Sequence, residues 1–279
     1  MCFIMDIAII IVTFFYVVSA AAYALYFFMK NKAFQKVGVV VFAGGFLAHC
    51  ALIGWGFVVA GHMPVRSLPE TLIVAAWAVA GVFLALQRGK SLKALGIYAA
   101  PLAALTMTAA SLLPKEPAQS KHIFASVWLA AHIISIFIGE AALALACGAG
   151  IFYLLQERAI KKKGRGFFFR RLPSLDLLDT TGYSCIVIGF VMLSIGLVAG
   201  FIYAKMVWGA FWRWDPKEVW SGVTWILYAV ILHGRLTVGW RGRRAAIFAI
   251  IGFLLMLFTF FGVNFLMEGH HGEFTRIKG

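Results

Sequence analysis

The chain has 279 residues, of which 62% are hydrophobic and only 13% are charged. Soluble globular domains average about 25% charged residues, so this composition, with a mean hydropathy of +0.91, excludes an ordinary water-soluble fold and indicates an integral membrane protein. The formal net charge is +14, from 25 Lys and Arg against 11 Asp and Glu. Because most of the basic residues fall in alternate connecting segments, we interpret the charge as a signal of membrane topology and expect no nucleic-acid partner.

Apolar segments long enough to cross a bilayer follow one another along the chain. A spanning helix needs about 20 predominantly apolar residues, and the period-2 alternation of a membrane β-barrel is absent. We therefore predict an all-α integral membrane protein with about eight transmembrane helices, over residues 7–29, 38–60, 70–86, 91–113, 123–155, 181–203, 221–238 and 245–267. Since no connecting segment is large enough for a soluble domain, residues 1–279 are predicted to form a single polytopic membrane domain.

The connecting segments differ in charge. The segments after the first, third, fifth and seventh predicted helices contain most of the Lys and Arg residues, and cytoplasmic loops carry such an excess. Both termini and the loop 204–220 are therefore predicted to lie outside, and we expect a multi-pass protein of the bacterial inner (cytoplasmic) membrane. In the longest inner loop, residues 156–179, a basic run precedes FFFRR. This pattern fits an interfacial segment against anionic membrane lipid, and a solvated linker explains it equally well.

The cysteine pattern limits the chemistry of the chain. The four cysteines form neither a CxxC pair nor a CxxCH motif, so neither a disulfide framework nor a zinc site is indicated. The chain is also not expected to carry a covalently attached c-type haem of its own.

Between the sixth and seventh predicted helices the chain reads WGAFWRWDPKEVW. Tryptophan offers a large, rigid, flat ring with one N–H donor, so such a cluster outside a core predicts a broad, flat, apolar ligand. Asp215 before Pro216 is a candidate N-cap of a helix that begins ahead of the membrane. An aromatic belt at the membrane interface is the alternative. The candidate ligand-binding residues here are Trp208, Phe211, Trp212, Trp214, Asp215 and Trp220.

Among the seven histidines, His49, His132 and His233 fall within predicted spans, where imidazole is rare and faces the bundle interior or binds a ligand. His132 lies about nine residues from its outer boundary, and His270 and His271 follow the last helix on the same side. His132 and one tail histidine could therefore ligate a haem iron from two sides. His49 and His233 each lie about twelve residues from the outer boundary, or about 18 Å, which suggests a deeper haem or a conducting route. For each intramembrane histidine, an interhelical hydrogen bond is the alternative.

At these residues the sequence resembles the haem-handling proteins with a tryptophan-rich WWD domain, and among them the CcsA family of the System II cytochrome c biogenesis pathway. The resemblance covers nearly the full length. The segments that carry it are WGAFWRWDPKEVWSGVTWILYAVILHGR, GHMPVRSLPETL, LAAHIISIFIGEAAL, LDLLDTTGYSCIVIGF and GVNFLMEGHHG. The sequence departs from the family pattern at Phe211, at Val219, in SLPE and in the tail GHHGEF, where register favours His271 over His270.

The resemblance implies a set of functional residues. It implies that His132 and His271 ligate a non-covalently bound haem b at the WWD segment, and that His233 ligates haem on its way across the membrane. The partner ligand of His233 would come from a companion CcsB-type subunit, whereas the depth estimate offers His49.

The implied function is export and presentation of haem at the outer face for covalent attachment to the CxxCH of apocytochrome c, as a component of a thioether-forming haem lyase. The implied partners are a CcsB-type subunit, apocytochrome c, a thiol-reducing thioredoxin-like protein and membrane lipid. Two alternatives stay open: a HemX-type haem-handling or haem-sensing regulatory membrane protein, and a solute transporter with an aromatic outer gate.

Overall fold

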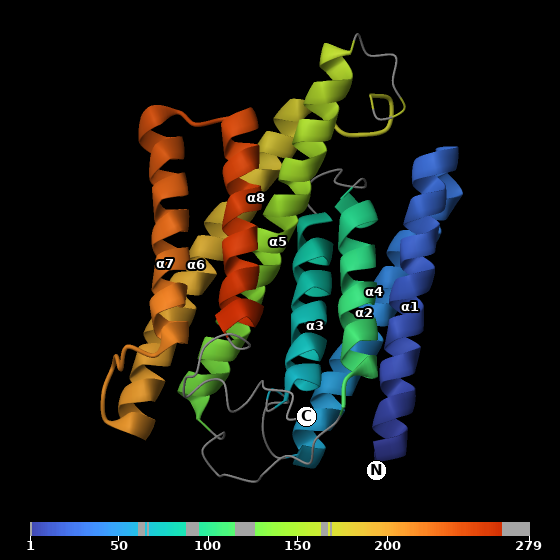
Figure 1. Cartoon of the computed structure of the whole chain (residues 1–279). Coiled ribbons are helices and arrows are strands. Elements are labelled where there is room, and N and C mark those ends of the chain that lie inside the picture. Colours follow the sequence, from blue (N-terminus) through green and yellow to red (C-terminus); the bar gives the residue numbers. More distant parts are fainter. Residues whose placement is uncertain are drawn as a thin grey trace. The chain divides into compact units, whose positions relative to one another are not determined.

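The computed structural model describes residues 2–60, 65, 67–87, 95–114, 126–162, 167 and 169–263. All regular elements within these ranges are helices (Figure 1), which confirms the predicted all-α class. The α-helices are α1 (Cys2–Met29), α2 (Lys32–Ala60), α3 (Leu68–Gln87), α4 (Gly96–Leu112), α5 (Val127–Lys161), α6 (Leu175–Trp208), α7 (Pro216–His233) and α8 (Arg243–Leu257). Two π-helical turns, η3 (Gly234–Val238) and η4 (Phe258–Gly262), follow α7 and α8.

The helices have the length and composition of membrane spans. Within the described residues, seven helices are long and apolar enough to cross a membrane, and α4 is apolar but shorter. With α4, the described helices follow the predicted order of about eight spans. Helices α5 and α6 have 35 and 34 residues, or roughly 50 Å at 1.5 Å per residue. Because the bilayer core is about 30 Å thick, their ends extend past the apolar layer unless they are tilted.

The chain divides into two compact units. Unit 1 contains Met1–Pro117 and Arg158–Pro173, and unit 2 contains Ala118–Glu157 and Ser174–Gly279. Helices α1 to α4 therefore belong to unit 1, whereas α6, α7, α8 and most of α5 belong to unit 2.

Aromatic rings fill the core of unit 1 and lie against small residues of neighbouring helices. Tyr16, Tyr23, Phe42 and Phe83 have no solvent-accessible surface. At Gly96 of α4, an added Cβ atom would lie 2.3 Å from Cε1 of Tyr23, closer than any real contact. Without a hydrophobic driving force between helices in lipid, close packing of this kind is a main source of helix association. Glycine at position 96 is therefore required for α4 to reach Tyr23.

The segment that follows α5 is attached to the end of α1. Arg171 donates from Nε to the Phe27 carbonyl at 2.6 Å and from Nη2 to the Phe28 carbonyl at 2.7 Å. The Phe167 ring lies against the rings of Phe27 and Phe28, 5.4 and 5.6 Å between centroids, and the Arg171 guanidinium lies 3.8 Å from its centroid. Since the last carbonyls of a helix lack partners within the helix, Arg171 caps α1. This part of the predicted inner loop is packed and not a free linker.

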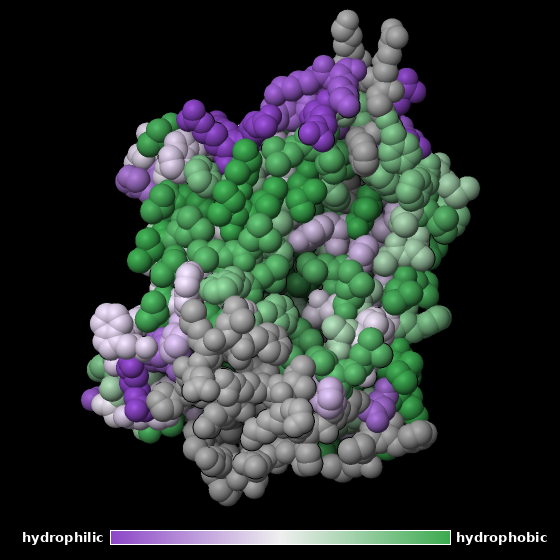
Figure 2. All heavy atoms as spheres, viewed as in Figure 1, coloured by the Kyte–Doolittle hydropathy of each residue, from purple (hydrophilic) through white to green (hydrophobic). Residues whose placement is uncertain are grey.

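In unit 2, α5 and α6 approach each other at glycine positions. An added Cβ at Gly139 would lie 3.1 Å from the Gly189 carbonyl oxygen, and one at Gly196 would lie 2.7 Å from Cδ1 of Ile136. The absence of side chains there brings the two backbones together, as small residues do in membrane helix pairs. Figure 2 shows hydrophobic surface along the sides of the helices and hydrophilic residues at the end where α7 turns into α8. The tryptophan segment, which comprises residues 208–220, lies at the other end of α7 (Figure 1).

We predict that Gly96→Ala destabilises the protein. The new methyl group overlaps the Tyr23 ring, and overpacking of a well-packed core costs about 1–3 kcal/mol. The measurement is the thermal unfolding midpoint in detergent. The matched control is Gly54→Ala in α2, where nothing lies within 4 Å of the added Cβ, so its midpoint should stay the same or rise. Equal midpoints for the two variants would contradict the packing of α4 on Tyr23.

Candidate functional site

A left-handed glycine begins the tryptophan segment. Helix α6 ends at Trp208, and Gly209 has φ 77, the left-handed conformation that commonly ends helices. The Gly209 N–H donates to the Lys205 carbonyl at 3.1 Å, while Lys205 Nζ donates to the Gly209 carbonyl at 2.8 Å. The predicted loop 204–220 thus consists of the last turn of α6, an irregular stretch over residues 209–215, and the first turn of α7.

The start of α7 is fixed by a capping box, in which Asp215 is the N-cap that the sequence predicts. Asp215 is the N-cap, and its Oδ1 accepts from the Lys217 N–H at 2.9 Å. Pro216 occupies the first helical position, where its missing N–H has no cost. In return, Glu218 Oε2 accepts from the Asp215 N–H at 3.3 Å. The helix therefore begins five residues before the predicted span 221–238.

Trp214 has an unusual backbone conformation. Its φ is 59, in the left-handed region that a bulky side chain rarely occupies, and its side chain is 78% exposed. Glu218 Oε2 accepts from the N–H groups of both its neighbours, Arg213 at 2.8 Å and Asp215 at 3.3 Å. Such strain persists only where surrounding contacts hold it, and it is common at binding sites. Glu218 was not predicted as a site residue, although the D-x-x-E spacing of a capping box signals it.

Trp212 lies between α6 and α7. Its ring contacts the Phe201 ring edge to face, with centroids 5.8 Å apart, and the Trp214 ring at the same separation. On the α7 side it lies near Gly222, where an added Cβ would be 3.6 Å from Cη2 of Trp212, an ordinary van der Waals contact. Its Nε1 is buried and has no acceptor among the described residues. A buried indole N–H normally has a partner, so this donor suits a polar group of a bound ligand.

The other predicted aromatic residues divide into packed and exposed groups. Trp220 contacts Phe258 of η4 at 4.8 Å between centroids, and Trp208 contacts Tyr203 at 6.4 Å. Phe211 is 56% exposed, with Lys205 Nζ 5.5 Å from its centroid. The packed rings anchor the segment, and Phe211 and Trp214 present apolar surface outward.

His132 is oriented by α6. Its Nδ1 lies 2.7 Å from the Gly196 carbonyl oxygen. Because a carbonyl only accepts, the proton of the neutral ring belongs on Nδ1 and the lone pair on Nε2, the arrangement typical of histidine ligands of metals. At Gly200, an added Cβ would lie 2.7 Å from the same nitrogen. Two glycines thus hold the imidazole against the α6 backbone, and no side chain could be added at Gly200 without moving it.

His132 and the tryptophan segment share one stretch of α6. Gly196 and Gly200 contact the imidazole, and the next residue, Phe201, packs on Trp212. The structure therefore brings together one predicted iron ligand and the predicted aromatic site. His271 and the neighbouring His270 lie outside the described residues.

His49 and His233 have contrasting surroundings. His49 in α2 is completely buried, and its Nδ1 lies 3.1 Å from the Tyr16 hydroxyl. The interhelical hydrogen bond that the sequence allowed is present there. Its Nε2 has no hydrogen-bond partner in the described part of the chain.

His233 is the last residue of α7, and it is exposed. The depth of about twelve residues, counted from the outer boundary of the predicted span 221–238, stays a prediction. Because α7 starts at Pro216, His233 lies nearer the opposite end of the span Pro216–Val238.

Protein side chains alone do not form a metal centre here. Among the described residues, no group of three or more His, Cys, Asp or Glu is placed to hold a metal ion. A haem iron needs only axial ligands from the protein, because the macrocycle supplies four. An imidazole oriented by a helix backbone, as His132 is by Gly196, fits that requirement.

Comparison with known proteins gives the family. The family model described as "Cytochrome C assembly protein" matches residues 65–271. The cytochrome c biogenesis protein CcsA of Prochlorococcus marinus (strain MIT 9312) is 34% identical over 265 residues, covering 87% of this chain and 85% of the relative. CcsA of Mesostigma viride is 31% identical over 277 residues, covering 89% of this chain and 90% of the relative.

The chain belongs to the cytochrome c assembly protein family. Within it, the chain is a CcsA-type cytochrome c biogenesis protein, as the resemblance implied. The fold of this CcsA-type protein is similar to that of the cytochrome c heme lyase CcmF, with a TM-score of 0.66 at 15% identity, over 97% of this chain and 48% of CcmF. This likeness supports the multi-span helical fold, and family membership links the CcsA-type protein to haem.

We predict that Gly200→Ala displaces His132. The added methyl group overlaps Nδ1, so the hydrogen bond to Gly196 should be lost, together with about 1–3 kcal/mol of stability. The measurement is ¹⁵N NMR of histidine-labelled protein, with the His132 signal assigned by its absence in His132→Gln. Gly182→Ala on the same helix is the control, because its nearest contact is an ordinary 3.8 Å. An unchanged Nδ1–H signal in Gly200→Ala would contradict the structure.

We also predict that Glu218→Ala releases the strained conformation of Trp214. The N–H groups of Arg213 and Asp215 then lose their acceptor, so both amides should exchange hydrogen faster, by more than tenfold. Glu218→Gln retains an acceptor oxygen and should give an intermediate rate. Hydrogen exchange followed by mass spectrometry measures the rates, and wild-type rates in both variants would refute the role given to Glu218.

Proposed function

We propose that this protein holds haem b non-covalently at the tryptophan segment on the outer face of the membrane, and presents it for covalent attachment to the CxxCH of apocytochrome c. One observation carries the proposal: residues 196–201 of α6 contact both the imidazole of His132 and the ring of Trp212. Family membership and the fold shared with the heme lyase CcmF support it.

The residues of the segment have distinct tasks in this proposal. His132 offers Nε2 to the iron, and His271 supplies the opposite ligand. The exposed rings of Trp214 and Phe211 lie against the flat face of the macrocycle, since ring stacking favours a large planar partner. The Trp212 N–H and the exposed guanidinium of Arg213 receive the haem propionates, because a guanidinium pairs well with carboxylates. Trp208, Asp215 and Trp220 maintain the shape of the segment.

The attachment reaction depends more on how the haem vinyl groups and the cysteines are oriented than on acid–base side chains. Each cysteine S–H of the CxxCH adds across one haem vinyl C=C bond, the proton going to one carbon and the sulfur to the other, so no oxidant is consumed. The cysteines must be reduced beforehand, which assigns a task to a thioredoxin-like partner. The protein supplies axial ligation and alignment, and the histidine of the CxxCH replaces one ligand on transfer. In this way the protein contributes to a thioether-forming haem lyase.

A second haem position accounts for His233. Its imidazole is exposed near the opposite end of α7 from the tryptophan segment, where an exposed polar ring in an apolar span needs a partner. We propose that His233 ligates haem during its passage across the membrane. For the second iron ligand at this position, a CcsB-type subunit is the first candidate, and His49 is the alternative. The setting is a bacterial inner membrane, with its lipids around both positions.

The proposal predicts two separable haem populations. Purified wild-type protein should show a Soret band, with bis-histidine α and β bands on reduction. His132→Ala and His271→Ala should each lose the outer haem, roughly half of the total, whereas His233→Ala should lose the other half. Absorbance of the reduced pyridine haemochrome per mole of protein measures the loss.

Three outcomes would contradict the proposal. A colourless wild-type protein would favour a transporter with an aromatic gate, and a haem content equal to that of the wild type in all three variants would remove the ligand assignment. Haem binding without covalent transfer to a coexpressed CxxCH reporter, even with a CcsB-type subunit present, would favour a regulatory, haem-sensing protein.

A further inference from the structure

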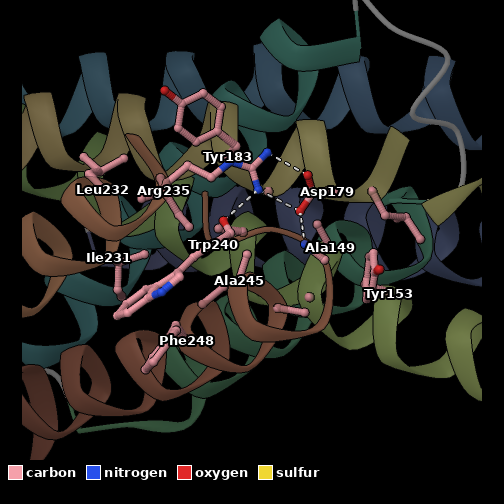
Figure 3. A pocket seen from close by; sticks show the side chains of 18 residues that line it. Ala149, Tyr153, Asp179, Tyr183, Ile231, Leu232, Arg235, Trp240, Ala245 and Phe248 are labelled. Atoms are coloured by element: carbon pink, nitrogen blue, oxygen red, sulfur yellow. Dashed lines mark hydrogen bonds and ion pairs between the residues drawn. The ribbon is translucent and has the colours of Figure 1, made fainter. Parts of the chain in front are cut away.

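A partly buried ion pair, drawn in Figure 3, joins the start of α6 to η3, the turn that follows α7. The Asp179 carboxylate of α6 accepts two bonds from the Arg235 guanidinium, at 2.8 Å from Nη1 and 2.6 Å from Nη2. The side chains are only 12% and 14% exposed. Paired N–H···O bonds of this kind are the strong and directional form of a salt bridge.

Further contacts fix the turn between α7 and α8 to the same carboxylate. Asp179 Oδ1 also accepts from the Gly242 N–H at 2.8 Å, and Arg235 Nη1 donates to the Trp240 carbonyl at 3.3 Å. The Arg235 guanidinium lies 4.8 Å from the centroid of Tyr183, again on α6. Asp179 thus holds the helix end and the following loop together.

Trp240 packs the turn from within. Its backbone N–H donates to the Gly234 carbonyl at 3.0 Å. Its ring stacks on Phe248 of α8, with ring centroids 4.9 Å apart and an interplanar angle of 16°. An added Cβ at Gly234 would lie 2.4 Å from Cε3 of Trp240. The pocket in Figure 3 is therefore bordered by this ring and by the Asp179–Arg235 pair.

His233 precedes Arg235 by two positions. Across the junction from α7 into the π-helical turn, two positions correspond to roughly half a turn of rotation. Arg235 and Ile231 border the pocket, whereas His233 is exposed on the same side as Ile226 and Val230. Fixing Arg235 on α6 therefore directs the imidazole of His233 away from α6.

The backbone after His233 is a π-helical turn, η3. Such turns are rare, short and frequent at functional sites, because their geometry is less favourable than that of an α-helix. The change from α-helix to π-helix alters the partners of the backbone carbonyls at this junction. Thr237 Oγ1 donates to one of them, the His233 carbonyl, at 2.7 Å. The direction of His233 at this junction depends on tertiary contacts, of which Asp179–Arg235 is the strongest.

We propose that the Asp179–Arg235 ion pair is a positioning device for His233. The pair fixes the rotation of the end of α7, so that the imidazole faces out of the unit in the direction from which haem is ligated. The identity of the ligand as haem rests on the proposed function, whereas the effect on the direction of His233 does not.

The test compares Asp179 variants with a matched ion pair at the same end of the unit. Asp179→Ala leaves the Arg235 charge without a partner, and a long cationic side chain then turns toward the headgroups. This rotation carries His233 toward α6. Asp179→Asn keeps the size and one acceptor oxygen, and Asp179→Glu keeps the charge. The control is Glu157→Gln, since Glu157 binds Arg243 at 3.4 Å with Arg243 62% exposed, and exposed pairs contribute little.

The first measurement needs no haem. Diethyl pyrocarbonate modifies exposed imidazoles, and mass spectrometry of peptides gives the rate at His233, with buried His49 as the internal reference. We expect the His233 rate to fall more than threefold in Asp179→Ala, to fall less in Asp179→Asn, and to stay at the wild-type value in Glu157→Gln. A wild-type rate in Asp179→Asn and Asp179→Ala would overturn the proposal, and Asp179→Asn alone decides the matter if Asp179→Ala does not fold.

The second measurement concerns haem. In a His132→Ala background only the inner haem remains, and Asp179→Ala should lower it more than fivefold, with partial recovery in Asp179→Glu. If the modification rate falls but the inner haem stays bound, the role in haem ligation is overturned. If the His132→Ala parent binds no haem, the proposed inner haem position fails, and the modification rates still decide whether Asp179 directs His233.

Discussion

The close approach of α5 and α6 is the constraint on which the site depends. Gly139 and Gly189 allow the two backbones to meet, and Gly196 and Gly200 continue the same contact toward the tryptophan segment. In a membrane every backbone polar group must find a partner within the protein, and the Gly196 carbonyl has the His132 imidazole beside it. The contact that packs two helices therefore also fixes the protonation form of a candidate iron ligand. The contact between α5 and α6 therefore serves both the association of the two helices and the orientation of His132.

The tryptophan segment combines rigidity with exposure. Rigid apolar rings in water are unfavourable, and a flexible loop would fold them back onto the protein. The segment avoids this because hydrogen bonds at both ends constrain its backbone, through Gly209 at the end of α6 and through Asp215 and Glu218 at the start of α7. Trp212 and Trp220 pack inward, so Trp214 can remain outward. A preformed surface of this kind loses little conformational entropy on binding.

Sequence alone predicted the features that depend on composition and local pattern. The helix number follows from hydropathy, and the cap at Asp215 follows from the order Asp, Pro and Glu, since both are local. The pairing of Asp179 with Arg235 joins residues 56 positions apart, and no local pattern signals it. The π-helical turn after His233 was also unpredicted, because it depends on how Trp240 packs against Gly234. The polar first turn of α7 lies outside the apolar run over 221–238, so hydropathy alone did not give the start of the helix at Pro216.

Helix α7 is attached to α6 along its whole length. Trp212, four residues before α7, contacts Phe201, Trp225 Nε1 in the middle of α7 donates to Ser194 Oγ at 2.8 Å, and Arg235 in η3, directly after α7, is bound to Asp179. Each residue of a helix advances by about 1.5 Å and turns by about 100°, so the separation and the relative angle of the aromatic segment and His233 are set by the number of residues between them. Helix α7 thus works as a spacer of fixed length and fixed twist, on which a single inserted residue would put the two ends out of phase.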